Sequence, residues 1–171
     1  LLMEFKTDIN NYLKNKPELK VHSLSDLIAF NIKHKKQEMP LFGQDIFIKA
    51  DKTKGTDSKN YQQHLKNAKR LAGAEGIDAT LKKYQLDLLI APTTGPAWSI
   101  VPDKKDHYLG SSWSAAAVAG YPHITVPMGF VNDLPVGLSF FSGFGKEGTL
   151  IEAAYNYEQA SLARKSPRLS L

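Results

Sequence analysis

The chain has 171 residues and no cysteine, which excludes disulfides and cysteine-ligated zinc sites. Its 42% hydrophobic and 23% charged residues are typical of a globular protein with one core, and no apolar run is long enough to span a bilayer, so no membrane partner is expected. The net charge of +5 comes from lysines scattered over the first half without interleaved aromatic residues, which argues against a nucleic-acid partner.

The first residues predict a helix and carry no targeting pattern. Apolar residues recur there at spacings of three and four, along one helix face: Phe5, Ile9, Tyr12 and Leu13. Pro17 ends this helix, and Ser23 is the expected N-cap of a second helix that begins at Leu24. The opening has neither the basic start nor the apolar core of a signal peptide, and a helix that begins at the first residue without a cap suggests that the native chain begins earlier, with any targeting segment upstream. The expected location is the cytoplasm.

A third helix is predicted to be long. The polar segment 52–58 is a predicted loop, and the helix runs from its end to about Tyr84. Gly73 and Gly76 weaken this helix or permit close packing against it. No linker long enough to divide domains interrupts the sequence, so we expect residues 1–171 to form a single domain or a fragment of one.

Three short apolar runs bounded by Pro or Gly predict buried strands: Leu86–Ala91, His123–Met128 and Val136–Ser142. The link between the last two has the length and residue types of a hairpin turn, so we expect these two strands to be antiparallel neighbours. A short buried helix with a serine cap is predicted over Ser112–Ala119, ended by Gly120, and a last helix over Glu147–Arg164. The predicted fold class is α/β, with helices covering a mixed β-sheet that is small for its cover and would extend a larger sheet.

Several of these segments together resemble the C-terminal part of amidase signature enzymes. Four follow one another in the family's order: Asp87–Thr93, Ala115–Pro122, Ile124–Gly129 and Leu134–Phe140. Three others resemble the branch of peptide amidases and cyclic-amide hydrolases: Leu24–Asn31, Phe42–Asp45 and Ala72–Ala79. The resemblance covers nearly the whole chain and implies the C-terminal portion of the amidase signature fold.

The resemblance also implies a chemistry, the hydrolysis of linear or cyclic carboxamides without a metal or organic cofactor. In the family, a lysine, a serine in a cis peptide and a nucleophilic serine lie in a Gly/Ser-rich region of the N-terminal half. This sequence contains no such region, so no catalytic residue can be assigned and the chain alone is expected to be inactive. Its expected partners are a small-molecule amide and the N-terminal half of the same domain. An unpaired strand edge and apolar surface predict self-association of the chain by itself.

Two segments are candidates for contacts with the substrate. The resemblance places Gly110–Trp113, with Ser111, Ser112 and Trp113, in a loop that approaches the acyl side of the substrate. Gln44 lies in a predicted loop, where its side-chain amide could hydrogen-bond an amide substrate. The alternatives are an exposed loop amide for Gln44 and a core aromatic for Trp113.

Other classes of function are less well supported. The histidines lack metal-ligand spacing, so no metal site is expected. Gly143–Gly148 matches G-x-G-x-x-G between a predicted strand and a predicted helix, the context of a dinucleotide fingerprint. However, no ribose-binding acid stands about twenty positions further on. The remaining alternative to an amidase part is a non-catalytic binding module derived from the same fold.

Overall fold

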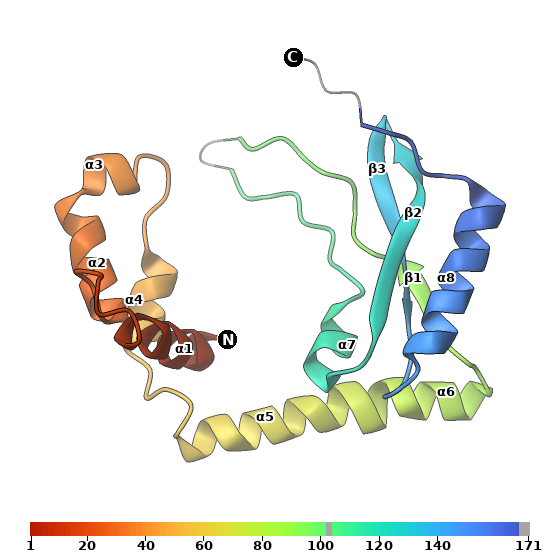
Figure 1. Ribbon diagram of the computed structural model, residues 1–171, viewed down its shortest axis with the longest axis horizontal. Coiled ribbons are helices and arrows are strands. Elements are labelled where there is room, and N and C mark those ends of the chain that lie inside the picture. Colours follow the sequence, from red (N-terminus) through yellow and green to blue (C-terminus); the bar gives the residue numbers. More distant parts are fainter. Residues whose placement is uncertain (102–103, 168–171) are drawn as a thin grey trace. The chain divides into compact units, whose positions relative to one another are not determined.

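The computed structural model describes residues 1–101 and 104–167, and it divides the chain into two compact units. Unit 1 comprises Leu1–Leu65 and unit 2 comprises Lys66–Leu171 (Figure 1). The expectation that both belong to a single domain, or to a fragment of one, stays a prediction.

Unit 1 is helical. It contains α1 (Leu2–Lys14), α2 (Leu24–Lys33), α3 (Lys35–Glu38), α4 (Asp45–Asp51) and the first part of α5 (Lys59–Ala72). Helices α1, α2 and α4 pack against one another around the buried residues Leu13, Leu24 and Ala50. The Ser23 hydroxyl accepts a hydrogen bond from the Asp26 amide at 3.1 Å, so the predicted N-cap of α2 is confirmed.

The predicted long helix is present, with an irregular middle. Helix α5 is followed without a break by the π-helical segment η1 (Gly73–Asp78) and by α6 (Ala79–Tyr84). A Cβ atom on Gly73 would lie 3.0 Å from the Tyr121 hydroxyl oxygen, so glycine permits the close packing that the sequence suggested. The Tyr121 hydroxyl in turn donates a hydrogen bond to the Asp78 carboxylate at the end of η1.

Unit 2 is built on a three-stranded sheet. Its strands are β1 (Leu89–Pro92), β2 (His123–Val131) and β3 (Leu134–Phe141), arranged in the order β1-β3-β2. Both pairings are antiparallel, and Asn132 and Asp133 form the hairpin turn with φ angles of 49° and 63°, so the predicted hairpin is confirmed. The mixed sheet expected of the larger domain stays a prediction.

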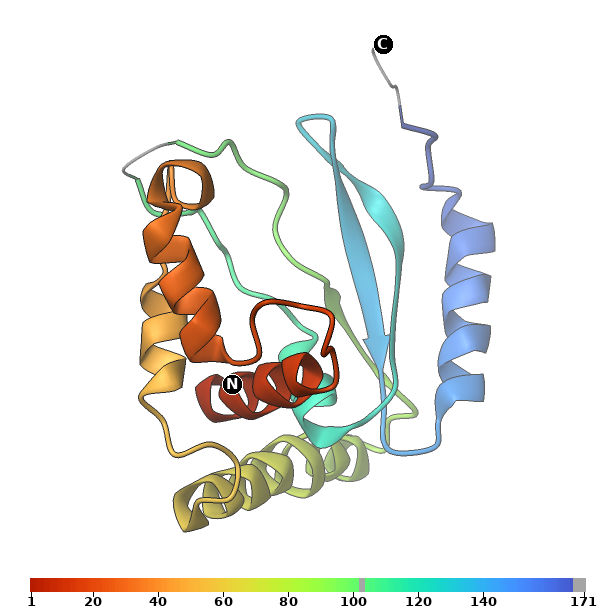
Figure 2. The ribbon, with the colours of Figure 1, turned by 60° about the vertical axis from the view of Figure 1, so that its left-hand side comes forward.

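One face of this sheet carries the core of unit 2. Helix α8 (Glu147–Ser161) lies along β2 and β3 in both ribbon views (Figure 2). Leu138 and Phe140 of β3 are buried there against Leu150 and Ala154 of α8. This confirms an α/β fold in which helices cover a small sheet. No helix in the described part of the chain is both long and apolar enough to cross a membrane.

The short helix α7 (Ser114–Ala119) differs from its prediction in two respects. Its N-cap is Trp113, which forms no side-chain cap, so the expected serine cap is wrong. Ala116 is its only buried residue, so the helix is not buried as a whole. Gly120 ends it with a φ of 77°, as predicted. The helix begins only at Ser114 because Ser111 and Ser112 form main-chain contacts with Thr94 and Thr93 after β1.

Candidate functional site

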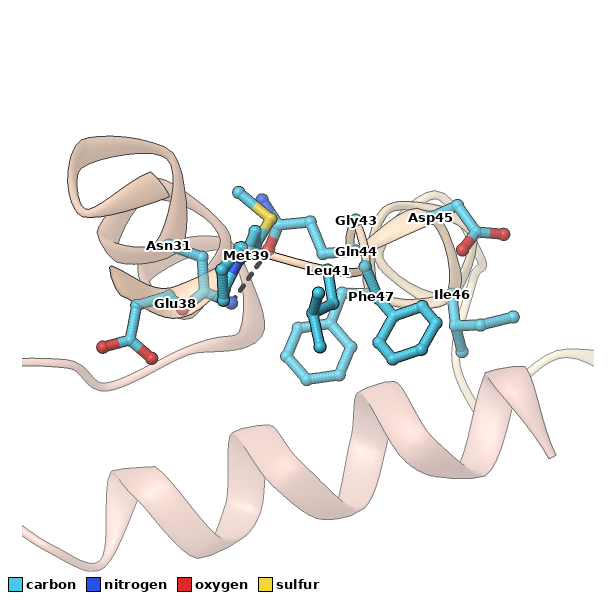
Figure 3. A pocket seen from close by; sticks show the side chains of 11 residues that line it. Asn31, Glu38, Met39, Leu41, Gly43, Gln44, Asp45, Ile46 and Phe47 are labelled. Carbon is cyan, nitrogen blue, oxygen red and sulfur yellow. Dashed lines mark hydrogen bonds between the residues drawn. The ribbon is translucent and has the colours of Figure 1, made fainter. Parts of the chain in front are cut away.

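Gln44 lies in a pocket of unit 1 with a volume of about 360 Å³, here called the Gln44 pocket (Figure 3). The pocket is lined by Asn31 and residues 38–47. Leu41 and Phe42 give it an apolar rim, since they are 74% and 71% exposed. A small apolar group with one polar end fits such a lining.

The Gln44 side chain already has two partners within unit 1. Its Oε1 accepts a hydrogen bond from Asn31 Nδ2 and its Nε2 donates one to the Ile28 carbonyl, both at 3.1 Å. These bonds tie the residue before α4 to α2, and Figure 3 shows the bond to Asn31. Its amide therefore serves the fold, and a contact with substrate stays a prediction.

Ser111 and Ser112 line a second pocket, in unit 2, with a volume of about 380 Å³, here called the Ser112 pocket. The other lining residues come from the end of β1 and from the returning chain: Pro92, Thr94, Gly95, Leu109 and Gly110. Thr94 and Ser111 form an antiparallel bridge, and the Thr94 hydroxyl donates to the Gly110 carbonyl at 2.9 Å. The pocket is therefore formed by two chain segments that hold each other through main-chain contacts.

The polar atoms of this segment differ in how well they are paired. The Ser112 amide donates to the Thr93 carbonyl at 3.1 Å, but its hydroxyl is buried without a hydrogen-bond partner among the described residues. The Ser111 hydroxyl lies 3.5 Å from the Ser114 hydroxyl. Trp113 is 40% exposed, so it is not a core aromatic, and it is absent from the described lining of the Ser112 pocket. A buried hydroxyl without a hydrogen bond costs free energy of folding, so a further polar partner would stabilise Ser112.

A cluster of hydroxyl groups that the sequence did not indicate lies beside the Ser112 pocket. The Ser139 hydroxyl donates to Thr93 Oγ1 at 2.8 Å, and Thr93 Oγ1 lies 2.5 Å from Thr125 Oγ1. We call Ser139, Thr93 and Thr125 the hydroxyl chain. Finding it requires the register of all three strands, because its members are 32 and 46 residues apart in sequence. Thr125 and Ser139 alone look like ordinary strand residues, and Thr93 follows the end of β1.

His123, at the start of β2, is a second polar group without a full set of partners. Its ring stacks on Phe141 with centroids 6.1 Å apart, and its Nε2 atom is buried without a partner among the described residues. Burial lowers the pKa of His123, because removal from water penalises the charged imidazolium. The ring is therefore neutral at pH 7.

These groups offer hydrogen bonds, but no described serine among them has a base beside it. Hydrolysis by a serine requires a base within hydrogen-bond distance of the hydroxyl, and none of the described serines has a histidine or lysine as a hydrogen-bond partner. The described residues also contain no group of three or more His, Asp or Glu that could hold a metal. The Gln44 pocket belongs to unit 1, and the Ser112 pocket belongs to unit 2.

The known proteins that this chain resembles in sequence and in structure are amidases. No protein-family model matches the sequence. A probable amidase of Arabidopsis thaliana is 35% identical over 98% of this chain, which covers 30% of that protein. The structure of native peptide amidase from Stenotrophomonas maltophilia matches 100% of this chain and 34% of its own, with 50% identity and a TM-score of 0.89. A peptide amidase bound to the competitive inhibitor chymostatin matches 99% of this chain and 34% of its own, with 51% identity and a TM-score of 0.92. The chain thus spans about a third of the length of these relatives.

Proposed function

This chain is the C-terminal portion of an amidase signature enzyme, and we propose that the complete protein hydrolyses carboxamide bonds other than those between amino acids of a peptide chain. The observation that carries the proposal is the match to peptide amidase over the whole chain, at 50% identity and a TM-score of 0.89. Similarity at this level, spread over both units, supports a shared chemistry more strongly than a shared fold alone would.

The proposed mechanism divides the work between this chain and the rest of the protein. The lysine, the cis-peptide serine and the nucleophilic serine of the family lie upstream, which agrees with the absence of a nucleophile and base pair among the described residues. Unit 2 supplies walls and hydrogen-bonding groups for the substrate through the Ser112 pocket. No step of this mechanism uses a metal or an organic cofactor.

We propose a small molecule with a linear or cyclic amide as the substrate class. The inhibitor complex of the related peptide amidase supports a small-molecule amide in general. The Ser112 pocket supports it too, because its volume of about 380 Å³ is small and Pro92 and Leu109 give it apolar walls.

The proposal extends to partners and location. The rest of the same polypeptide is the proposed partner of this chain, and a cytoplasmic location is proposed with it. Large apolar side chains on the surface of unit 2 support a covered surface, since Ile90 is 60% and Phe144 is 81% exposed. For the same reason, the chain by itself is expected to self-associate.

A chimeric enzyme tests the proposed function. In this chimera, the present chain replaces the corresponding third of the Stenotrophomonas maltophilia peptide amidase. We expect it to release ammonia from peptide amides, whereas the upstream part of that amidase alone releases none. A chimera that unfolds cooperatively but releases no ammonia from peptide amides or small carboxamides would contradict the proposal.

A further inference from the structure

The hydroxyl chain lies on the sheet face opposite α8. Leu138 and Phe140 point toward α8, so Gly137 and Ser139 point to the other side, because side chains alternate along a strand. The register places Thr125 of β2 opposite Ser139, and Thr93 donates its amide to the Gly137 carbonyl at 2.7 Å. Three hydroxyl groups from different parts of the sequence therefore meet above β3.

The number of protons in this cluster determines which hydroxyl group donates to which. Ser139 is fully buried and donates to Thr93, so the Thr93 proton must find another acceptor. If Thr125 also donated to Thr93, the half-buried Thr93 hydroxyl would have no acceptor for its proton among the described residues, at the cost of one hydrogen bond. The arrangement without this cost runs from Ser139 to Thr93 to Thr125. It leaves one free donor, the Thr125 hydroxyl.

This free donor lies at the accessible end of the chain. Thr125 is exposed, whereas Ser139 is fully buried. Gly137 leaves the space that the hydroxyl groups need, because a Cβ atom there would lie 2.7 Å from Thr125 Oγ1 and 2.8 Å from Thr93 Oγ1. The sequence thus has its smallest residue where two hydroxyl groups must approach the strand.

The free donor is also close to the candidate substrate pocket. Thr93 lies between Pro92 and Thr94, which both line the Ser112 pocket, and its carbonyl accepts the Ser112 amide. The Ser112 hydroxyl also lacks a partner among the described residues. Two hydroxyl groups with unused hydrogen-bonding capacity therefore border one region of unit 2.

We propose that the hydroxyl chain is a binding device that presents the Thr125 hydroxyl as a donor to a carbonyl oxygen. Ser139 and Thr93 act as positioning residues, because their bonds hold the Thr125 proton outward. The carbonyl belongs either to the amide substrate or to the main chain of the rest of the protein. The first source rests on the proposed function, and the second does not.

A variant pair in the chimera isolates the outward bond. In a Thr93→Val background, Thr125 has lost its internal partner, so a further Thr125→Val removes only the outward donor. If the acceptor is the substrate, the double variant should have a KM about five-fold above that of Thr93→Val, with kcat little changed. If the acceptor is a main-chain carbonyl, its melting temperature should fall below that of Thr93→Val at unchanged KM. Equal KM and equal melting temperature in the two variants would overturn the proposal.

Further variants keep the test decisive if Thr93→Val does not fold. Ser139→Ala removes the Ser139–Thr93 bond without touching the outward donor. Thr125→Val instead removes the Thr93–Thr125 bond together with the outward donor, so it should have the larger effect. Thr125→Ser should restore the wild-type values, and Thr149→Val on α8 serves as the matched control outside the hydroxyl chain. Equal effects of Ser139→Ala and Thr125→Val would overturn the proposal. If the wild-type chimera folds but is inactive, the proposed function fails, and the melting temperatures still test the donor.

Discussion

Replacement of Gly137 by alanine is the most direct perturbation of the hydroxyl chain. The added Cβ would lie 2.7 Å from Thr125 Oγ1 and 2.8 Å from Thr93 Oγ1. Both distances are so short that the new carbon atom and the two oxygen atoms would repel each other. Both oxygens belong to threonines, whose branched side chains have few alternative rotamers, so relief requires the two hydroxyl groups to separate.

The expected cost has two parts. Overpacking of a close-packed site costs about 1–3 kcal/mol. Separation of the hydroxyl groups also weakens the hydrogen bond from the buried Ser139 hydroxyl to Thr93, worth about 1 kcal/mol. We therefore expect Gly137→Ala to lower the free energy of unfolding by about 2–4 kcal/mol.

Urea unfolding of the chimera, followed by fluorescence, measures this cost. Gly148→Ala is the matched control, because nothing lies within 4 Å of a Cβ atom there and alanine favours the helix. Gly137→Ala should shift the midpoint to lower urea, and Gly148→Ala should leave it unchanged or raise it. Equal midpoints for the two variants would refute the close approach of the hydroxyl groups to β3.

Three further predictions concern other polar contacts. Gln44→Ala removes the bonds to α2 and should cost about 1–2 kcal/mol in chimera stability at unchanged KM, whereas a raised KM with unchanged stability would identify Gln44 as a substrate contact. The hydrogen bond to Asp78 raises the pKa of Tyr121, so Tyr121→Phe should be less stable than the wild type at neutral pH. This difference in stability should disappear as the pH rises from about 10 through the raised pKa. A difference in stability that persisted at the highest pH would contradict the bond. Burial lowers the pKa of His123, so the unfolded chain gains a proton first, and stability should fall as the pH drops from about 6.5 toward the lowered pKa. His123→Phe should flatten urea midpoints measured across that range, and an unchanged slope would contradict the burial of His123.

The features predicted from sequence were those specified by neighbouring residues. The cap of α2 depends on Ser23 and the amide three residues later, and the β2–β3 hairpin depends on a short turn. Helix α4 was missed because Ile46, Phe47 and Ile48 are consecutive apolar residues without helical spacing. The first strand was placed about three residues too early, because its start is set by pairing with β3 rather than by its own sequence.

The site was less predictable than the fold. Ser111 and Ser112 came from the family resemblance, and the structure places them in one pocket, but their contact with substrate stays a prediction. The hydroxyl chain could not be predicted, because it depends on the register of β1 and β2 against β3. The partners of Gln44 depend on how α2 packs against α4, which a sequence pattern does not specify.

The size of the native polypeptide tests the central claim most directly. An antibody raised against this chain should detect, in an extract of the source cells, a band about three times the 19.0 kDa of the chain, because the chain covers 34% of the related peptide amidase. The protein purified from that band should release ammonia from a carboxamide. A single band at 19 kDa would contradict the account, and a non-catalytic binding module would then explain the chain better.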